Sequence, residues 1–280
     1  MGHNGSTALD LLLDKADGCT GTSQLNDLLV LYNPFDETGD QRPAFVRDFW
    51  TSLLNSLSDD ERSELKAENR SVLKEKRIFD FTFSAKKRAK YAEANLRLIS
   101  RLHAELEGGT IVDSSKNISR VLGLLESPDL GIYVVHLTRD VRGYVGSHNK
   151  RRKENGRRPI YFIPTMVWFA KNVAASMLVK PRAQNYLHVC YEQMMLEPDR
   201  FLDELGSFIG CDLGQCKPAL NGKQPLRPAE SLGFLGNRVL QNREEVLLDS
   251  SRVASHQLYQ SKVYWVLLGW VAKFWGYKFN

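Results

Sequence analysis

The chain has 280 residues, of which 42% are hydrophobic and 25% are charged, enough to bury the core of one α/β domain. Its net charge of +5 comes from one segment, residues 148–158, which contains six Lys and Arg residues and a single acid, Glu154. One local basic segment indicates a local anionic ligand or a solvated loop. It argues against a nucleic-acid partner, for which a basic stripe along a whole element is expected.

The chain opens with a glycine-flanked loop, Gly2-His3-Asn4-Gly5-Ser6-Thr7, followed directly by an apolar helical stretch. Small residues allow successive backbone N–H groups to turn around an anion, and the following helix directs its positive end to the same place. The loop differs from that of nucleotide hydrolases, because Gly5 stands where a lysine usually precedes the Ser or Thr. A simple turn with a helix cap is an equal alternative. The phosphate-binding interpretation therefore needs a second anion site.

Residues 44–107 are predicted to be mainly helical. Apolar residues between Phe45 and Leu57 recur at helical spacing, and Ser58-Asp59-Asp60-Glu61 has the form of a capping box. An amphipathic run follows and ends at Gly108-Gly109. We expect a helical insertion within a single domain that spans residues 1–280.

Three apolar segments, 110–112, 132–137 and 186–191, are predicted to be buried strands. Helical stretches alternate with them: a short one closed by Ser127-Pro128, then 164–179 and 198–209. This alternation predicts an α/β fold, a three-layer sandwich with a central parallel sheet. The irregular segment 210–236 is typical of a binding loop, and the aromatic-rich segment 264–277 of a packing helix.

The four cysteines have neither CxxC spacing nor neighbouring histidines, and we expect reduced thiols. The apolar run 263–272 is shorter than the roughly 20 residues that a bilayer span needs. With no signal peptide recognised, we expect a soluble, cytoplasmic protein with no membrane partner.

The most distinctive motif is a buried strand that ends in Arg139-Asp140-Val141-Arg142, with Ser147 eight residues after Arg139. Three further motifs accompany it along the chain: Val112-Asp113-Ser114-Ser115-Lys116, Tyr191-Glu192 followed by Glu197-Pro198 and a Phe-Leu-x-x-Leu helix, and Leu235-Gly236-Asn237-Arg238.

In content and order these motifs resemble those of sulfotransferases that use 3′-phosphoadenosine 5′-phosphosulfate (PAPS), in particular bacterial members whose loop is Gly-His-Ser-Gly-Ser-Thr. The resemblance spans residues 1–243 and is weakest over 20–108, where acceptor-binding elements would lie. It implies a P-loop-containing, sulfotransferase-like fold. It also implies transfer of a sulfuryl group from PAPS to a hydroxyl or amine of a small-molecule acceptor, with 3′,5′-adenosine bisphosphate (PAP) as product and no metal.

The resemblance also implies a role for each matching residue. The loop Gly2, His3, Asn4, Gly5, Ser6 and Thr7 would bind the 5′-phosphosulfate. Arg139, whose planar fork suits a phosphate, would bind the 3′-phosphate together with Ser147. The late loop Gly236, Asn237 and Arg238 would close over the adenosine. His3 and Lys116 would stabilise the leaving nucleotide, and Asp113 is the candidate general base.

Three features depart from the family pattern. His3 replaces the usual loop lysine or arginine, so that catalysis would depend on Lys116 or on protonated His3. Leu240 stands where the late loop usually has an arginine, which leaves Arg238 or Arg243 for that role. The family's first strand would precede Gly2, so we expect either a start set too late or a sheet that lacks a central strand.

Other interpretations of these residues remain open. Arg139 and Arg142 are compatible with a helix-start ion pair to Asp140, and Asp113 and Lys116 with a structural network. The basic run 150–158 fits a mobile solvated loop, or a loop that closes over an anionic cofactor or acceptor.

Two other functions also remain open at this point. A kinase on a similar loop would use ATP and Mg²⁺, and a non-catalytic relative would bind PAP without turnover. His136, within a buried strand, is expected to be a core histidine and not a base.

Overall fold

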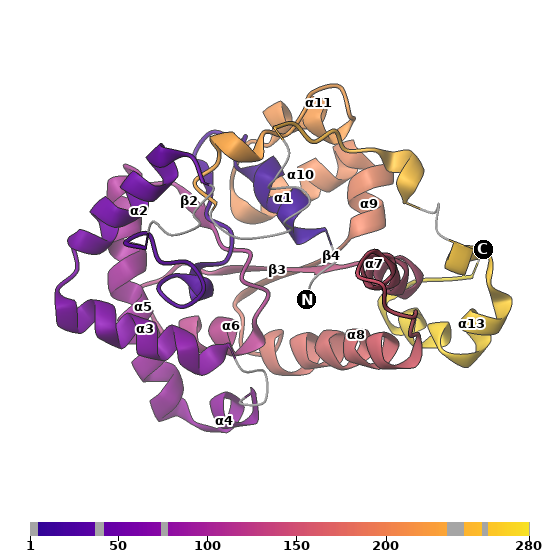
Figure 1. The fold of residues 1–280 in the computed structure, drawn as a ribbon, viewed down its shortest axis with the longest axis horizontal. Coiled ribbons are helices and arrows are strands. Elements are labelled where there is room, and N and C mark those ends of the chain that lie inside the picture. The colour runs from indigo at the N-terminus through magenta and orange to yellow at the C-terminus, as the bar shows by residue number, and fades with distance from the viewer. Residues whose placement is uncertain (1–4, 37–41, 74–77, 234–243, 254–256, 280) are drawn as a thin grey trace.

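The computed structural model describes residues 5–36, 42–73, 78–233, 244–253 and 257–279 (Figure 1). Residues 44–105 form one side of the molecule, and short strands run through its middle. Residues 141–179 and 257–279 form the other side. Most of the regular structure is helical, and every strand pair is parallel.

The segment that periodicity predicts to be helical contains α2 (Ala44–Asn55), α3 (Asp59–Val72), α4 (Ile78–Phe83) and α5 (Ala85–Glu105). The predicted capping box starts α3. Ser58 Oγ accepts a hydrogen bond from the Glu61 N–H at 3.2 Å, and the Glu61 carboxylate accepts one from the Ser58 N–H at 2.8 Å. The apolar faces of α2, α3 and α5 pack around Trp50, which is fully buried.

The described strands form two parallel pairs. β1 (Cys19–Gly21) pairs with β2 (Thr110–Val112), and β3 (Tyr133–Thr138) pairs with β4 (Asn185–Cys190). The sequence predicted β2, β3, β4 and their parallel direction, but in one sheet. It did not predict β1, because Cys-Thr-Gly is too short to show alternation and ends in a residue that strands disfavour.

The β3–β4 pair is covered on both faces. On one face α8 (Phe162–Ala174) supplies Asn172, whose Oδ1 lies 2.9 Å from His136 Nε2, while the Tyr186 hydroxyl lies 2.6 Å from His136 Nδ1. Burial lowers the pKa of His136 to about 4, and the expected core histidine is confirmed. On the other face Phe208 of α10 (Pro198–Ile209) meets the ring of Tyr133.

The other α-helices of the described residues are α1 (Ser6–Leu13), α6 (Ile118–Leu124), α7 (Val141–Glu154), α9 (Tyr191–Leu196), α11 (Lys217–Leu220) and α13 (Lys262–Leu267). A π-helical turn lies at Ala175–Val179, and the longest 3₁₀ segment described is Gly269–Trp275. One expectation is wrong here. The basic segment expected to be a loop is helical through Glu154, since lysines and arginines favour helix and stabilise the negative C-terminal end of α7.

Buried side chains gather in three main clusters. One lies between α1, the strands and α10, a second lies within residues 25–106, and a third joins α7 and α8 to residues 264–277. None of the four cysteines forms a disulfide, in agreement with the expected reduced thiols.

Candidate functional site

The helix α1 begins directly after Gly5, whose backbone makes the turn into the helix. Gly5 has a φ of 93°, in the left-handed region that residues with a side chain rarely adopt. No side chain caps this end of α1. Because the first N–H groups of an α-helix have no partner within the helix, this end suits an anion.

Tyr191, the first residue of α9, joins this loop to Arg139. A Cβ built on Gly5 would lie 2.3 Å from Tyr191 Cδ2, so the ring packs directly against the loop backbone. The guanidinium carbon of Arg139 lies 4.6 Å from the centre of the same ring. Arg139 follows β3 and Tyr191 follows β4, and the parallel pairing brings these two carboxyl ends together. The two anion sites predicted from separate motifs are therefore neighbours across one aromatic ring.

The two arginines of the Arg-Asp-x-Arg motif have different surroundings. Arg142 is almost fully buried and pairs with Asp140 at 2.7 Å between Nη2 and Oδ2. It also stacks on Tyr259 and Trp265 and donates to the Lys278 carbonyl at 2.7 Å. Arg142 thus forms the structural ion pair with Asp140 that the sequence allowed for this motif. Arg139 instead contacts Tyr191.

Ser147 lies on the helix that covers Arg139. A Cβ built on Gly143 of α7 would lie 2.9 Å from Arg139 Nε, so this point of the helix touches the guanidinium. Residues four apart share a face of an α-helix, and Ser147 is four residues after Gly143. The geometry therefore places Ser147 on the same face of α7 as the Arg139 contact.

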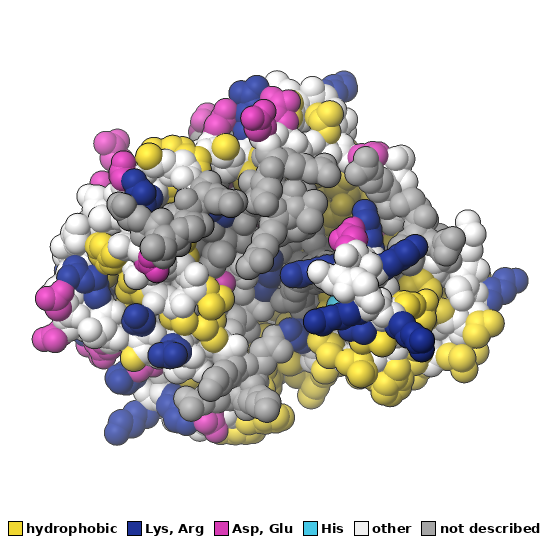
Figure 2. All heavy atoms as spheres, viewed as in Figure 1, with side chains coloured by type: hydrophobic (Ala, Val, Ile, Leu, Met, Phe, Trp, Pro, Cys, Tyr) yellow, Lys and Arg dark blue, Asp and Glu magenta, His cyan; other side chains and the backbone are white. Residues whose placement is uncertain are grey.

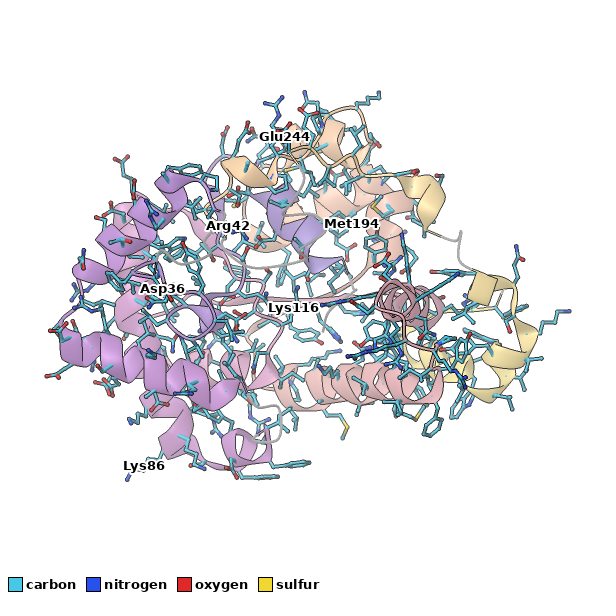
Figure 3. The ribbon with its side chains drawn as sticks, viewed as in Figure 1. Asp36, Arg42, Lys86, Lys116, Met194 and Glu244 are labelled. Carbon is cyan, nitrogen blue, oxygen red and sulfur yellow. The ribbon has the colours of Figure 1, made fainter. Side chains whose placement is uncertain are left out.

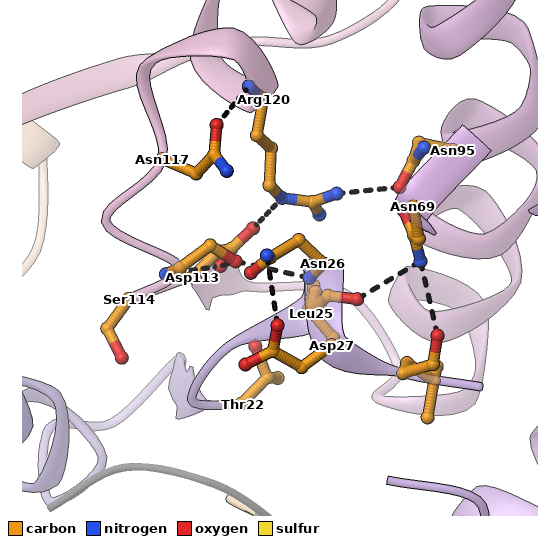
Figure 4. A network of polar contacts seen from close by, with 12 residues as sticks. Thr22, Leu25, Asn26, Asp27, Asn69, Asn95, Asp113, Ser114, Asn117 and Arg120 are labelled. Carbon is orange, nitrogen blue, oxygen red and sulfur yellow. Dashed lines mark hydrogen bonds and ion pairs between the residues drawn. The ribbon is translucent and has the colours of Figure 1, made fainter. Parts of the chain in front are cut away.

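Asp113 belongs to a buried polar network at the end of β2 (Figure 4). Its Oδ2 lies 2.6 Å from Nε of Arg120, a residue that is 1% exposed, and its Oδ1 accepts from the N–H and the hydroxyl of Ser115. Arg120 in turn donates to the Tyr91 hydroxyl and to Asn95 Oδ1, each at 2.7 Å. Both carboxylate oxygens of Asp113 are thus engaged.

Lys116 lies in the centre of the molecule, near the start of α1 (Figure 3). Its φ of 58° is unusual for a residue with a side chain. Burial lowers the pKa of Lys116, and the nearby carboxylates of Asp10 and Asp27 act in the opposite direction. Lys116 therefore lies close to Asp10 of α1 and to Asp27, at a site where burial disfavours its charged form.

Asp10 is a buried acid on α1 that the sequence analysis did not select. It is 2% exposed, and its Oδ1 has no hydrogen-bond partner among the described residues. Burial and the charge of Asp14, one turn later on α1, raise the pKa of Asp10 to about 8. The signal was present in the sequence, since Asp10 is the only charged residue within Ala8-Leu9-Asp10-Leu11-Leu12-Leu13. Arg120 is a second missed residue, although it too is the only charged residue of its stretch, Ile118-Ser119-Arg120-Val121-Leu122-Gly123-Leu124.

Several predicted site residues lie outside the described residues. These are Gly2, His3 and Asn4 of the opening loop and Gly236, Asn237 and Arg238 of the late loop. Within the part of the chain that the structure describes, no group of three or more His, Cys, Asp or Glu side chains is placed to hold a metal ion.

No protein-family model matches the chain, and no curated protein matches it in sequence. Among solved structures, the chain is similar to the sulfotransferase domain from the Synechococcus PCC 7002 olefin synthase, with a TM-score of 0.55 and 18% identity. The match covers 100% of this chain and 93% of that one. The chain therefore has the fold of a sulfotransferase domain.

Proposed function

We propose that the protein is a sulfotransferase that transfers the sulfuryl group of PAPS to a hydroxyl or amine of a small molecule. The observation that carries the proposal is the contact of Tyr191 with both Gly5 and Arg139. This contact sets the amide end of α1 beside a guanidinium, which suits a nucleotide with two separate anionic groups. The fold shared with a sulfotransferase domain supports the same reaction class.

Some residues near Gly5 would bind the nucleotide, and others would stabilise the charge that develops during transfer. The backbone of the loop and the side chains of Ser6 and Thr7 would hold the 5′-phosphosulfate, while Arg139 and Ser147 would hold the 3′-phosphate. PAPS supplies the sulfuryl group and departs as PAP. Lys116, together with His3, would stabilise the negative charge that develops on the departing oxygen. Catalysis in this scheme is mainly alignment and electrostatics.

Asp113 stays our candidate for the base that takes the proton of the acceptor. Asp113 also pairs with Arg120 and accepts a hydrogen bond from Ser115, which is a structural role. An experiment must therefore distinguish a base from a structural carboxylate. The same engagement makes Asp113 a poor Mg²⁺ ligand, since Arg120 already neutralises its charge. This disfavours the kinase alternative.

The proposal includes the finer predictions that the resemblance implies. The late loop Gly236, Asn237 and Arg238 would close over the adenosine, the molecule as a whole would have the three-layer order, and the acceptor would be a small molecule met in the cytoplasm. The β3–β4 pair, with α8 and α10 on its two faces, supports that order locally.

The experiment that tests the proposal is a calorimetric titration of the protein with PAP, compared with ATP plus Mg²⁺. We expect PAP to bind at least about tenfold more tightly, because ATP lacks the 3′-phosphate that Arg139 would hold. Tighter binding of ATP with Mg²⁺, or binding of neither, would contradict the proposal. PAP release from PAPS with a panel of hydroxyl and amine acceptors then distinguishes an enzyme from a non-catalytic binding protein.

A further inference from the structure

The side of the molecule built by residues 150–182 and 257–279 is strongly basic. These two segments contain twelve Lys and Arg residues against one acid, Glu154, a net charge of +11. Because the whole chain has a net charge of +5, all other residues together carry −6. Figure 2 shows Lys and Arg side chains gathered in front of an apolar area on this side. The charge of the protein is therefore concentrated on one face.

Apart from Lys262 at its start, the helix α13 on this face is apolar on both its inner and its outer side. Tyr264 and Trp265 point into the protein and are buried. Val263, Val266 and Leu267, together with Trp270 of the following 3₁₀ segment, occupy positions i, i+3, i+4 and i+7 and are exposed. The three aliphatic side chains are between 66% and 70% exposed. A helix with a second apolar stripe directed outward needs an apolar environment on that side.

The helix α8 continues this apolar surface. Phe162 and Ile163 at its start are each 62% exposed, and Val167, one turn after Ile163, is also exposed. α8 contacts both α13 and the 3₁₀ segment that follows it. Thr165 lies within hydrogen-bond distance of the Tyr264 hydroxyl of α13, at 2.7 Å, and Phe169 meets Phe274 of the 3₁₀ segment with ring centres 6.0 Å apart. One continuous apolar patch thus lies beside the basic C-terminal end of α7.

We propose that this face docks the protein on an anionic lipid bilayer, with the exposed stripes of α13 and α8 among the lipid headgroups and the basic residues against their phosphates. We name it the docking face: the apolar residues Phe162, Ile163, Val167, Val263, Val266, Leu267, Trp270 and Phe274, with the basic segment 150–158. Exposed aromatic and aliphatic residues beside a cluster of positive charge are what an interfacial protein presents to lipids. This inference does not depend on the proposed reaction.

Other occupants fit the docking face less well. A nucleic acid would pair with the arginines but leave the aliphatic stripe of α13 in water. A second copy related by two-fold symmetry would set two basic segments 150–158, each with a net charge of +5, against each other. Charge and apolar area together therefore favour an anionic bilayer.

The protein would lie on the bilayer and not cross it. Residues Phe162–Val179 form one helical stretch long and apolar enough to span a membrane, and 28% of them are buried. Yet Trp168 and Asn172 on the inner side of α8 are buried and hydrogen-bonded to the Arg139 carbonyl and to His136. The expectation of no membrane partner came from the length of apolar runs, which says nothing of apolar stripes that the fold leaves exposed.

The test is co-sedimentation of the protein with vesicles of phosphatidylcholine alone or with 30% phosphatidylglycerol. We expect binding to the anionic vesicles that is at least about tenfold stronger and that weakens in 0.5 M NaCl. The double variants Val266→Ser/Leu267→Ser and Arg157→Glu/Arg158→Glu should each lose at least about tenfold of that binding. Absence of co-sedimentation with anionic vesicles at low salt would overturn the proposal, even if this face were found to bind another protein.

A matched control removes two exposed apolar side chains elsewhere. Leu196 at the end of α9 and Leu247 are 61% and 60% exposed, and neither belongs to the segments that form the docking face. Leu196→Ser/Leu247→Ser should bind anionic vesicles as the parent protein does. Equal losses in this variant and in Val266→Ser/Leu267→Ser would show nonspecific adhesion and overturn the proposal. PAP binding should be unchanged in all variants, so a failure of the proposed reaction is separately visible.

Discussion

The guanidinium of Arg139 stacks on the ring of Tyr191, with 4.6 Å between the guanidinium carbon and the ring centre. The same ring closes on Gly5 at the start of α1, so one side chain sets the spacing between a helix end and an arginine. Stacking holds the planar fork of the arginine in one orientation before any ligand arrives. This arrangement leads to the first two predictions.

Arg139→Ala should weaken the binding of PAP by about 2–4 kcal/mol, because truncation removes a charge-assisted contact to a phosphate. Isothermal calorimetry measures the loss. Arg182→Ala is the control, since Arg182 is an exposed arginine whose removal changes the net charge by the same amount. Equal affinities of the two variants would remove the 3′-phosphate assignment of Arg139.

Gly5→Ala should destabilise the protein and impair PAP binding, because the new methyl group would collide with Tyr191. The matched control is Gly156→Ala. Gly156 also has a positive φ, 67°, but a Cβ there meets nothing within 4 Å. Both variants carry the backbone cost of about 1–2 kcal/mol, and we expect Gly5→Ala to lose at least about 1 kcal/mol more from the clash. Chemical denaturation of the two variants provides the comparison. Equal losses of unfolding free energy in the two variants would mean that the Tyr191 ring moves aside without an energetic cost.

Asp10→Asn should change how stability depends on pH. The pKa of Asp10 is about 8 in the folded protein and near 3.8 when unfolded. Between these values the folded chain keeps a proton that the unfolded chain has released, so the contribution of Asp10 to the free energy of unfolding falls as pH rises from 4 to 8. The variant lacks this loss, and its stability relative to the parent should increase from pH 5 to pH 8.

Denaturation at several pH values measures this relative stability. Asp17→Asn, a change at an exposed acid soon after α1, should follow the parent at every pH. A constant difference between Asp10→Asn and the parent would show that Asp10 is already charged when folded.

Asp113→Asn should lower the free energy of unfolding by about 3 kcal/mol, because it leaves the buried Arg120 without its counterion. Denaturation at fixed pH measures this loss. Arg120→Met breaks the same ion pair but keeps the carboxylate. If Asp113 is the base, the turnover of folded Asp113→Asn should fall far below that of Arg120→Met, and comparable turnover would leave Asp113 a structural role only.

Sequence patterns predicted those parts of the fold whose signals are local. The helix Pro198–Ile209 begins at a proline suited to a first turn and ends before Gly210, with a φ of 73°, and both bounds were predicted. β1 was missed because three residues carry no pattern. That β2 and β3 belong to separate pairs depends on contacts between distant segments, which no local pattern contains.

The candidate site shows the same division. Arg139 was recognised from its motif, but the Tyr191 ring that orients it was noted only as part of a junction. Asp113 was selected as a carboxylate at a strand end. Its partner Arg120 was missed although it is the only charged residue of α6, because no local pattern shows which acid a buried arginine pairs with. The sequence also could not predict which side of the segment 264–277 faces outward, because both sides of α13 are apolar.

The left-handed backbone of Lys116 has a consequence for protein engineering. Glycine at such a position would relieve a strain of about 1 kcal/mol, so a redesign for thermal stability alone would replace this lysine early. The replacement would also take away the basic side chain that interacts electrostatically with Asp10. If Lys116 serves the proposed reaction, stability and activity favour different residues at position 116, and thermostabilising libraries should then leave it unchanged.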